Sequence, residues 1–130
     1  MKETITKFDQ SPPCSGPYSL AVKTEGKLLF VTGQGPWDPR TKKFERGSLA
    51  DQTRLTLESI KRIVEAAGGR MENAVSCRVF LQTLNAKTFA EMNGVYDKYW
   101  GVNKPARTTV GAQLLNIDVE IDCVVSLGST

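Results

Sequence analysis

A chain of 130 residues has the size of one domain and is long enough to bury a hydrophobic core without disulfide bonds. Its 17 Lys and Arg residues nearly balance 14 Asp and Glu residues, and no basic stripe with interleaved aromatic residues is present, so the net charge of +3 does not favour a nucleic-acid-binding protein. The sequence contains no histidine, which excludes Ser-His-Asp and Cys-His nucleophile systems and HExxH metalloenzymes.

The N-terminal segment is expected to form an arm followed by a hairpin. Residues 1–15 are predicted to be a flexible, loosely attached arm, because Pro12-Pro13 is incompatible with a helix. Alternating apolar residues predict strands over residues 18–23 and 27–32. The turn residues at 24–26 then predict that these two strands pair as a hairpin.

Two helices with a strand between them are predicted next. Ser48 is expected to cap a first helix, whose apolar residues recur at helical spacing until Gly68-Gly69 ends it. Alternation over residues 75–81 predicts a strand with one apolar face. Thr88 is expected to cap a second helix that carries aromatic residues on one side and ends before Gly101.

Residues 107–114 and 117–127 are predicted to be two further strands, joined as a hairpin at Leu115-Asn116. The predicted order is therefore β-β-α-β-α-β-β, an α+β domain in which two helices cover one face of a mixed sheet. The other face is expected to meet other subunits. It is predicted to carry Arg78, Phe80, Arg107, Thr109, Asp118, Glu120 and Asp122.

The best chemistry in the chain is a guanidinium and a carboxylate on the last predicted hairpin. If the turn is correct, Arg107 and Glu120 share a face, with Cα atoms roughly 14 Å apart along the strands. Arginine can clamp a carboxylate and glutamate can move a proton. A solvated surface role is the alternative for both residues, since Glu120 alternates just as Asp118 and Asp122 do.

The sequence supports neither a metal nor a cofactor. The cysteines are odd in number and widely separated, and no Cys/His spacing typical of zinc is present. Glycine-rich nucleotide motifs are absent as well. The first residues contain no apolar run, so we expect no signal peptide and no membrane span, and a cytoplasmic protein.

Short segments spread over nearly the whole chain resemble the Rid/YjgF family of reactive-intermediate deaminases. Most of these segments are weak markers alone, but the last two form the family's signature. The segments are Gly16-Pro17-Tyr18-Ser19, Phe30-Val31-Thr32-Gly33-Gln34, Asp38-Pro39, Glu65-Ala66-Ala67-Gly68, Val79-Phe80-Leu81, Met92-Asn93-Gly94-Val95-Tyr96, Pro105-Ala106-Arg107 and Val119-Glu120-Ile121.

The resemblance implies one chorismate-mutase-like domain over residues 1–130, a homotrimer, and clefts between its subunits. It implies that Arg107 binds the substrate carboxylate and that Glu120 positions the hydrolytic water. The residues that it places along the cleft are Tyr18, Thr32, Gly33, Asn93 and Thr109. Thr109 stands where many members carry a cysteine, and Thr32 stands where many carry a serine. Trp37 is expected in a loop near the cleft.

The activity implied is hydrolysis of 2-imino or enamine acids, such as 2-aminoacrylate or 2-iminobutyrate, to 2-oxo acids and ammonia, as a protection against reactive metabolites. No cofactor is required, because the imine is already electrophilic. The alternative is a non-catalytic trimer that binds 2-oxo or imino acids or has a regulatory role. An RNA-directed role is the least favoured, because histidine and a basic stripe are both missing.

Overall fold

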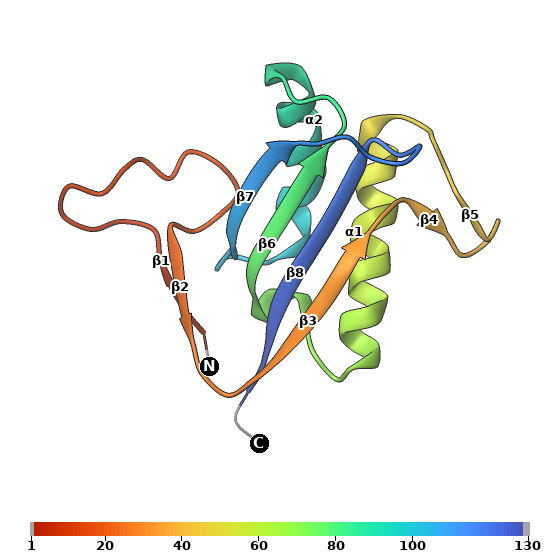
Figure 1. Ribbon diagram of the computed structural model, residues 1–130. Coiled ribbons are helices and arrows are strands. Elements are labelled where there is room, and N and C mark those ends of the chain that lie inside the picture. Colours follow the sequence, from red (N-terminus) through yellow and green to blue (C-terminus); the bar gives the residue numbers. More distant parts are fainter. Residues whose placement is uncertain (1, 129–130) are drawn as a thin grey trace.

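A four-stranded sheet forms the centre of the computed structural model, which describes residues 2–128 (Figure 1). In spatial order, its strands are β3 (Lys27–Gln34), β8 (Val119–Gly128), β6 (Ala74–Leu81) and β7 (Ala106–Gly111). β8 is antiparallel to both of its neighbours, whereas β7 is parallel to β6. The last strand of the chain therefore lies inside the sheet, between two strands that precede it.

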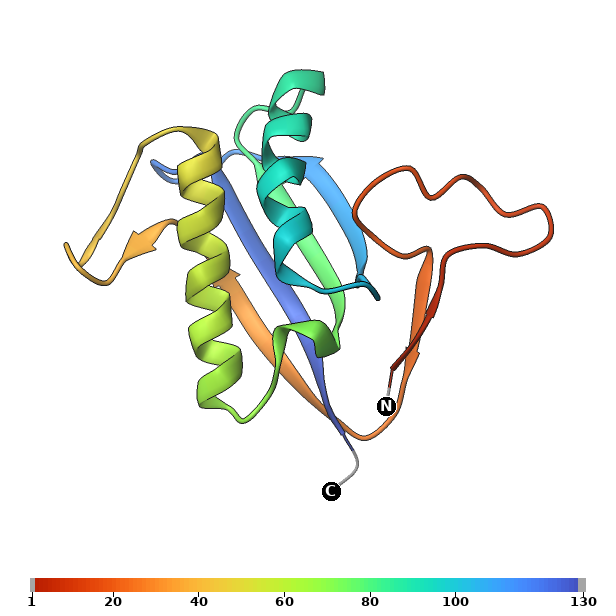
Figure 2. The ribbon, with the colours of Figure 1, turned by 180° about the vertical axis from the view of Figure 1, so that it is seen from behind.

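Both helices lie on one face of this sheet (Figure 2). α1 (Leu49–Ala66) connects β3 to β6, and α2 (Ala86–Tyr96) connects β6 to β7. These two crossovers proceed in the same direction across the sheet, and right-handed crossovers of this kind place their helices on the same side. The predicted α+β arrangement is confirmed. Neither helix within residues 2–128 is long and apolar enough to cross a membrane.

Local hydrogen bonds fix where the two helices begin. The Ser48 side chain accepts a bond of 3.1 Å from the Asp51 amide, which confirms the predicted cap of α1. α2 begins instead at Asn85, whose Oδ1 accepts from the Thr88 amide at 2.9 Å, while Thr88 Oγ1 accepts from the Asn85 amide at 3.0 Å. The prediction of Thr88 as the cap was wrong, because Thr88 is the third residue of α2 and closes the capping box that Asn85 begins.

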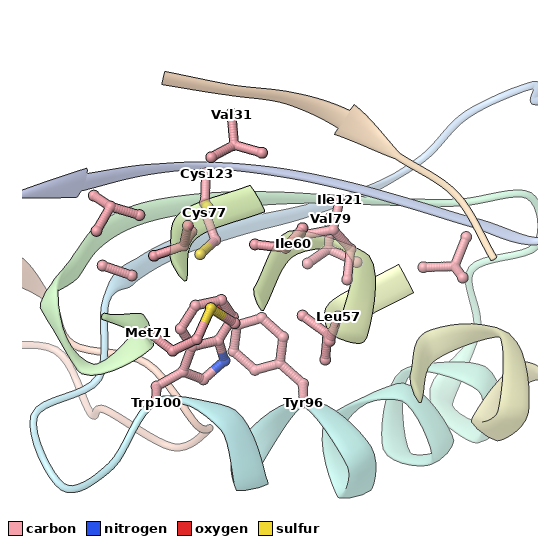
Figure 3. Close-up of a cluster of buried hydrophobic side chains, with 14 of the residues drawn as sticks. Val31, Leu57, Ile60, Met71, Cys77, Val79, Tyr96, Trp100, Ile121 and Cys123 are labelled. Atoms are coloured by element: carbon pink, nitrogen blue, oxygen red, sulfur yellow. The ribbon is translucent and has the colours of Figure 1, made fainter. Parts of the chain in front are cut away.

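The core lies between the helices and the sheet. Tyr96 and Trp100 extend from α2 and the short helix η2 (Asp97–Tyr99) toward Cys77 on the sheet, with ring centroids 5.1 Å apart (Figure 3). A second short helix, η1 (Met71–Asn73), adds a buried methionine. The core residues are Val31, Leu57, Ile60, Val64, Met71, Ala74, Cys77, Val79, Leu81, Met92, Tyr96, Trp100, Val119, Ile121, Cys123 and Val125.

Two short strands beside the main sheet involve the N-terminus. β1 (Lys2–Ile5) pairs in antiparallel fashion with β2 (Ala21–Thr24), so part of the expected arm is a strand. β3 pairs with β8 rather than with β2. The predicted hairpin of residues 18–23 and 27–32 was therefore wrong. The chain does turn at residues 24–26, but the strand before the turn pairs with β1 and the strand after it pairs with β8.

A second ribbon projects from the far end of β3 (Figure 1). β4 (Trp37–Asp38) pairs with β5 (Lys43–Phe44). The Asp38 carboxylate closes the turn between them: Oδ1 accepts from the Arg40 amide at 2.9 Å, and Oδ2 accepts from the Arg40 guanidinium at 3.1 Å. This ribbon holds Trp37 and Phe44 beside the end of the main sheet.

Candidate functional site

Arg107 lies on β7 and its side chain points toward α2. Its Nη1 donates a hydrogen bond of 2.7 Å to Asn93 Oδ1. Its guanidinium carbon lies 4.9 Å from the ring centroid of Tyr96, 5.4 Å from Phe89 and 5.5 Å from Tyr18. These distances fall within the range of cation–π attraction. Three aromatic rings and one amide therefore hold the guanidinium.

No carboxylate among residues 2–128 forms an ion pair with Arg107. Burial lowers the pKa of its guanidinium, which nevertheless stays protonated at neutral pH. Removing a cation from water without a counter-ion is unfavourable, and an anionic ligand relieves that cost. The arrangement fits a carboxylate that binds through the donors of Arg107 that Asn93 leaves free.

Thr109 and Tyr18 lie next to Arg107. Thr109 follows it by two residues on β7 and so lies on the same face of the sheet. Thr109 Oγ1 is buried and has no hydrogen-bond partner among residues 2–128, so its hydroxyl is an unused donor beside Arg107. A bond of 3.0 Å from the Ser19 amide to the Pro105 carbonyl fixes the segment of Tyr18 beside β7. We call Tyr18, Asn93, Arg107 and Thr109 the Arg107 cluster.

Glu120 points to the face that the helices leave open. It lies on β8 between Val119 and Ile121, which are fully buried under the helices, and side chains alternate along a strand. Its carboxylate covers the backbone of Gly33, where an added Cβ atom would overlap Glu120 Oε2. No hydrogen bond or ion pair from residues 2–128 reaches this carboxylate. We call Thr32, Gly33 and Glu120 the Glu120 cluster.

The two clusters lie on opposite faces of the sheet within one chain. β6 separates β7 from β8, so the predicted hairpin of these two strands was wrong. Arg107 is level with Cys77 on β6, and Glu120 is level with Phe80. The two Cα atoms are thus two strands and three residues apart, or about 14 Å. The prediction that Arg107 and Glu120 share a face was wrong as well.

A pocket of about 620 Å³ opens beside Glu120, between the β4–β5 ribbon and the segment that precedes β8. Its lining residues are Gly33, Gln34, Gly35, Trp37, Phe44, Arg46, Ser59, Leu115, Asn116, Ile117 and Glu120. The sequence placed Trp37 near the cleft but did not single out Gly35, Phe44 or Ile117. The only local signal was the density of glycine and proline after β3, which indicates a turn and says nothing of a pocket.

Comparison with known proteins identifies the family. A family model described as Endoribonuclease L-PSP matches residues 8–127. A RutC family protein of Pyrococcus horikoshii is 44% identical over 122 residues, which cover 94% of each chain. The chain belongs to the Rid/YjgF family. The predicted family resemblance is thereby confirmed.

Further Rid/YjgF relatives bear on fold and naming. The chloroplastic Reactive Intermediate Deaminase A of Arabidopsis thaliana is 33% identical over 129 residues, which cover 98% of this chain and 67% of the relative. A crystal structure of the Rid family protein YyfB from Yersinia pestis matches with a TM-score of 0.87 at 21% identity, covering 97% of this chain and 98% of that chain. The latter match confirms the fold. The deaminase name belongs to the plant protein, and the archaeal relative has a family name alone.

Proposed function

We propose that this protein hydrolyses 2-imino acids and their enamine tautomers to 2-oxo acids and ammonia, in clefts between the subunits of a homotrimer. The observation that carries the proposal is a pair of incomplete half-sites. Arg107 is a partly buried cation without a carboxylate partner among residues 2–128, and Glu120 is a carboxylate without a hydrogen-bond donor there. Each cluster supplies what the other lacks.

An assembly of several copies can unite the two clusters. β7 is an edge strand of the sheet, and the open face bears apolar side chains such as Phe30, which is 72% exposed. Exposed apolar groups on one face are typical of a protein–protein interface. In a ring of three copies, each edge strand would meet the open face of the next copy. Arg107 of one subunit would then face Glu120 of a neighbouring subunit.

The chemistry requires little beyond orientation and an activated water. Arg107 holds the substrate carboxylate through charge-assisted hydrogen bonds, and the Thr109 hydroxyl adds a further donor. Glu120 accepts a proton from water as the water oxygen bonds to C2 and the C=N bond opens to a carbinolamine. That proton passes to the nitrogen and completes the amino group of the carbinolamine. Glu120 then transfers the hydroxyl proton to the same nitrogen as the C–N bond breaks, so that ammonia leaves and the 2-oxo acid remains.

A direct assay tests this proposal. Iminopropionate is generated in situ, and its loss is followed by competition with a trapping amine such as semicarbazide. We expect Glu120→Gln to lower kcat by roughly 10²–10⁴-fold, because proton transfer is lost. We expect Arg107→Ala to lower kcat/KM by about 100-fold or more, because a bidentate charged contact is lost. Matched controls are Glu65→Gln and Arg62→Ala on the exposed side of α1, which should retain activity.

Two outcomes would contradict the proposal. Turnover that does not exceed the rate in buffer would show that the protein is no deaminase. If pyruvate or 2-oxobutyrate still bound through Arg107 in that case, the non-catalytic binding protein would be the correct alternative. Equal activity of the wild type and both site variants would show that the two clusters have no part in the reaction.

A further inference from the structure

The pocket beside Glu120 is far larger than the side chain of a small imino acid. Its volume is about 620 Å³. The methyl group of a three-carbon imino acid would fill only a small part of this space. The volume instead lies in the range of pockets that enclose drug-sized ligands.

Apolar and aromatic side chains form one part of the pocket wall. Trp37 and Phe44 come from the β4–β5 ribbon, and Ile117 comes from the segment before β8. The charge of Arg46, at the rim, is already paired with Asp118 at 3.2 Å. A second anionic group on a ligand would have to compete with this ion pair. The lining therefore fits an apolar or aromatic group better than another carboxylate.

Gly35 leaves room for this pocket. Its φ lies outside the left-handed region, so the backbone does not require glycine here. A Cβ atom at this position would lie 3.0 Å from Ile117 Cδ1 and 3.4 Å from Phe44 Cε1. Any larger side chain would extend between the pocket walls. Glycine at residue 35 is therefore explained by the room that it leaves in the pocket and not by its backbone conformation.

The position of Glu120 determines which group of the substrate lies at the pocket. The proposed reaction adds water at C2 beside Glu120, and C2 also bears the carboxylate, the nitrogen and the substrate side chain. The carboxylate is directed to Arg107 of another subunit. The substrate side chain begins one bond from C2, so it lies within a few Å of Glu120, at the mouth of the pocket that Glu120 lines. We infer that this pocket selects 2-imino and 2-oxo acids with bulky apolar side chains, aromatic ones above all.

The inference deepens the proposed function and rests on it for the placement of C2. The test compares kcat/KM for the imines of phenylalanine, leucine and alanine, each generated in situ by an L-amino-acid oxidase in the presence of catalase. We expect the phenylalanine imine to exceed the alanine imine by at least tenfold, on the order expected when an apolar pocket is filled. Isothermal titration with phenylpyruvate and pyruvate provides a second readout that does not require turnover.

Two variants connect the preference to the pocket. Gly35→Leu fills the floor, and Trp37→Ala removes a wall, so each should lower kcat/KM for the phenylalanine imine about tenfold more than for the alanine imine. The matched control is Gly47→Leu in the following loop, where an added Cβ atom meets only Asp51, at an ordinary 3.5 Å. This control should leave the ratio of the two substrates unchanged. If Gly35→Leu fails to fold, Trp37→Ala still decides the question.

The outcomes separate this inference from the proposed function. Rapid turnover of the alanine imine without an aromatic preference would overturn the inference and leave the deaminase intact. An aromatic preference that persists in both Gly35→Leu and Trp37→Ala would overturn the inference as well. If no imine is turned over but phenylpyruvate binds more tightly than pyruvate, and loses this advantage in the pocket variants, the inference stands and the deaminase proposal fails. Equal binding of both acids without turnover would overturn both.

Discussion

Arg107 is held by contacts that leave its charge uncompensated. Three rings cover it at 4.9 to 5.5 Å, and a neutral amide oxygen accepts one of its hydrogen bonds at 2.7 Å. A carboxylate at the position of that amide would bind the guanidinium more strongly, but it would also neutralise it. The neutral Asn93 thus orients the side chain and leaves its charge available to a ligand.

The uncompensated charge of Arg107 predicts opposite effects of one substitution on stability and on binding. Asn93→Asp should raise Tm or leave it unchanged, because an ion pair with Arg107 replaces a neutral contact. The same variant should raise KM for imino acids by at least tenfold, since the substrate carboxylate must displace the new one. Thermal unfolding and the imine assay measure the two effects. Asn93→Ala adds no charge, so it should raise KM less than Asn93→Asp does, and it should lower Tm. A larger rise of KM in Asn93→Ala than in Asn93→Asp would contradict this prediction.

Gly33 has a comparable role on the other face of the sheet. An added Cβ atom would overlap the Glu120 carboxylate, yet the φ of Gly33 lies outside the left-handed region. We predict that Gly33→Ala leaves Tm nearly unchanged, because Glu120 is partly exposed and can move aside. Activity should fall at least tenfold, since a displaced general base is a poor one. A variant with full activity and an unchanged Tm would show that the position of Glu120 is not critical.

Among the elements, the β4–β5 ribbon has its turn closed by one side chain, Asp38. The Asp38 side chain is only 7% exposed, and its carboxylate accepts bonds from both the amide and the guanidinium of Arg40. The hydrogen bonds from the Arg40 side chain are the main reason why the pKa of Asp38 lies below its ordinary value of 3.8. Asp38 precedes the turn and adjoins Trp37, so it also shapes the pocket.

The direction of this pKa shift predicts a pH dependence. A carboxyl group with a lowered pKa in the folded state stabilises the fold above its ordinary value of 3.8, and the contribution is lost as the pH falls through the folded pKa. Asp38→Asn, which keeps the turn but loses the charge, should therefore lower Tm at pH 7. The difference from the wild type should shrink as the pH falls below 3.8. A constant difference across this range would show that the charge of Asp38 does not matter.

For the whole molecule, the central feature is the insertion of β8 between β3 and β6. It turns Val119 and Ile121 to the helices and Glu120 to the open face, while β7 turns Arg107 to the helices at the edge of the sheet. A single chain thus presents the two proposed half-sites on opposite faces of the sheet. Activity should belong to the assembly alone.

Mixing two inactive variants tests this prediction. Arg107→Ala subunits retain Glu120, and Glu120→Gln subunits retain Arg107. In the proposed trimer, reassembly from an equal mixture should recover about a quarter of the wild-type activity, since one random interface in four combines both intact residues. Activity is measured before and after the mixture is dissociated and reassociated. The absence of any recovery, with trimers confirmed by sedimentation, would place the complete site within one chain or remove the two residues from it.

Local features of the sequence were sufficient to predict the two helices and the fold class. α1 was correctly predicted because its apolar period, its Ser48 cap and its terminal glycines all act over a few residues. The pairing of strands was not predicted correctly in either hairpin. Strand partners are chosen by contacts between distant segments, and a turn such as residues 24–26 does not reveal whether the strands on its two sides join each other.

Local patterns and a family signature were enough to predict the helices, the mixed sheet covered on one face and the family, and to single out Arg107 and Glu120 as candidates. The folded chain was needed to show that these two residues face opposite ways, that Asn93 and three rings hold Arg107, and that a pocket lies beside Glu120. The position of β8 explains this difference. One strand inserted between two others changes which side chains can meet, and no local pattern records that insertion.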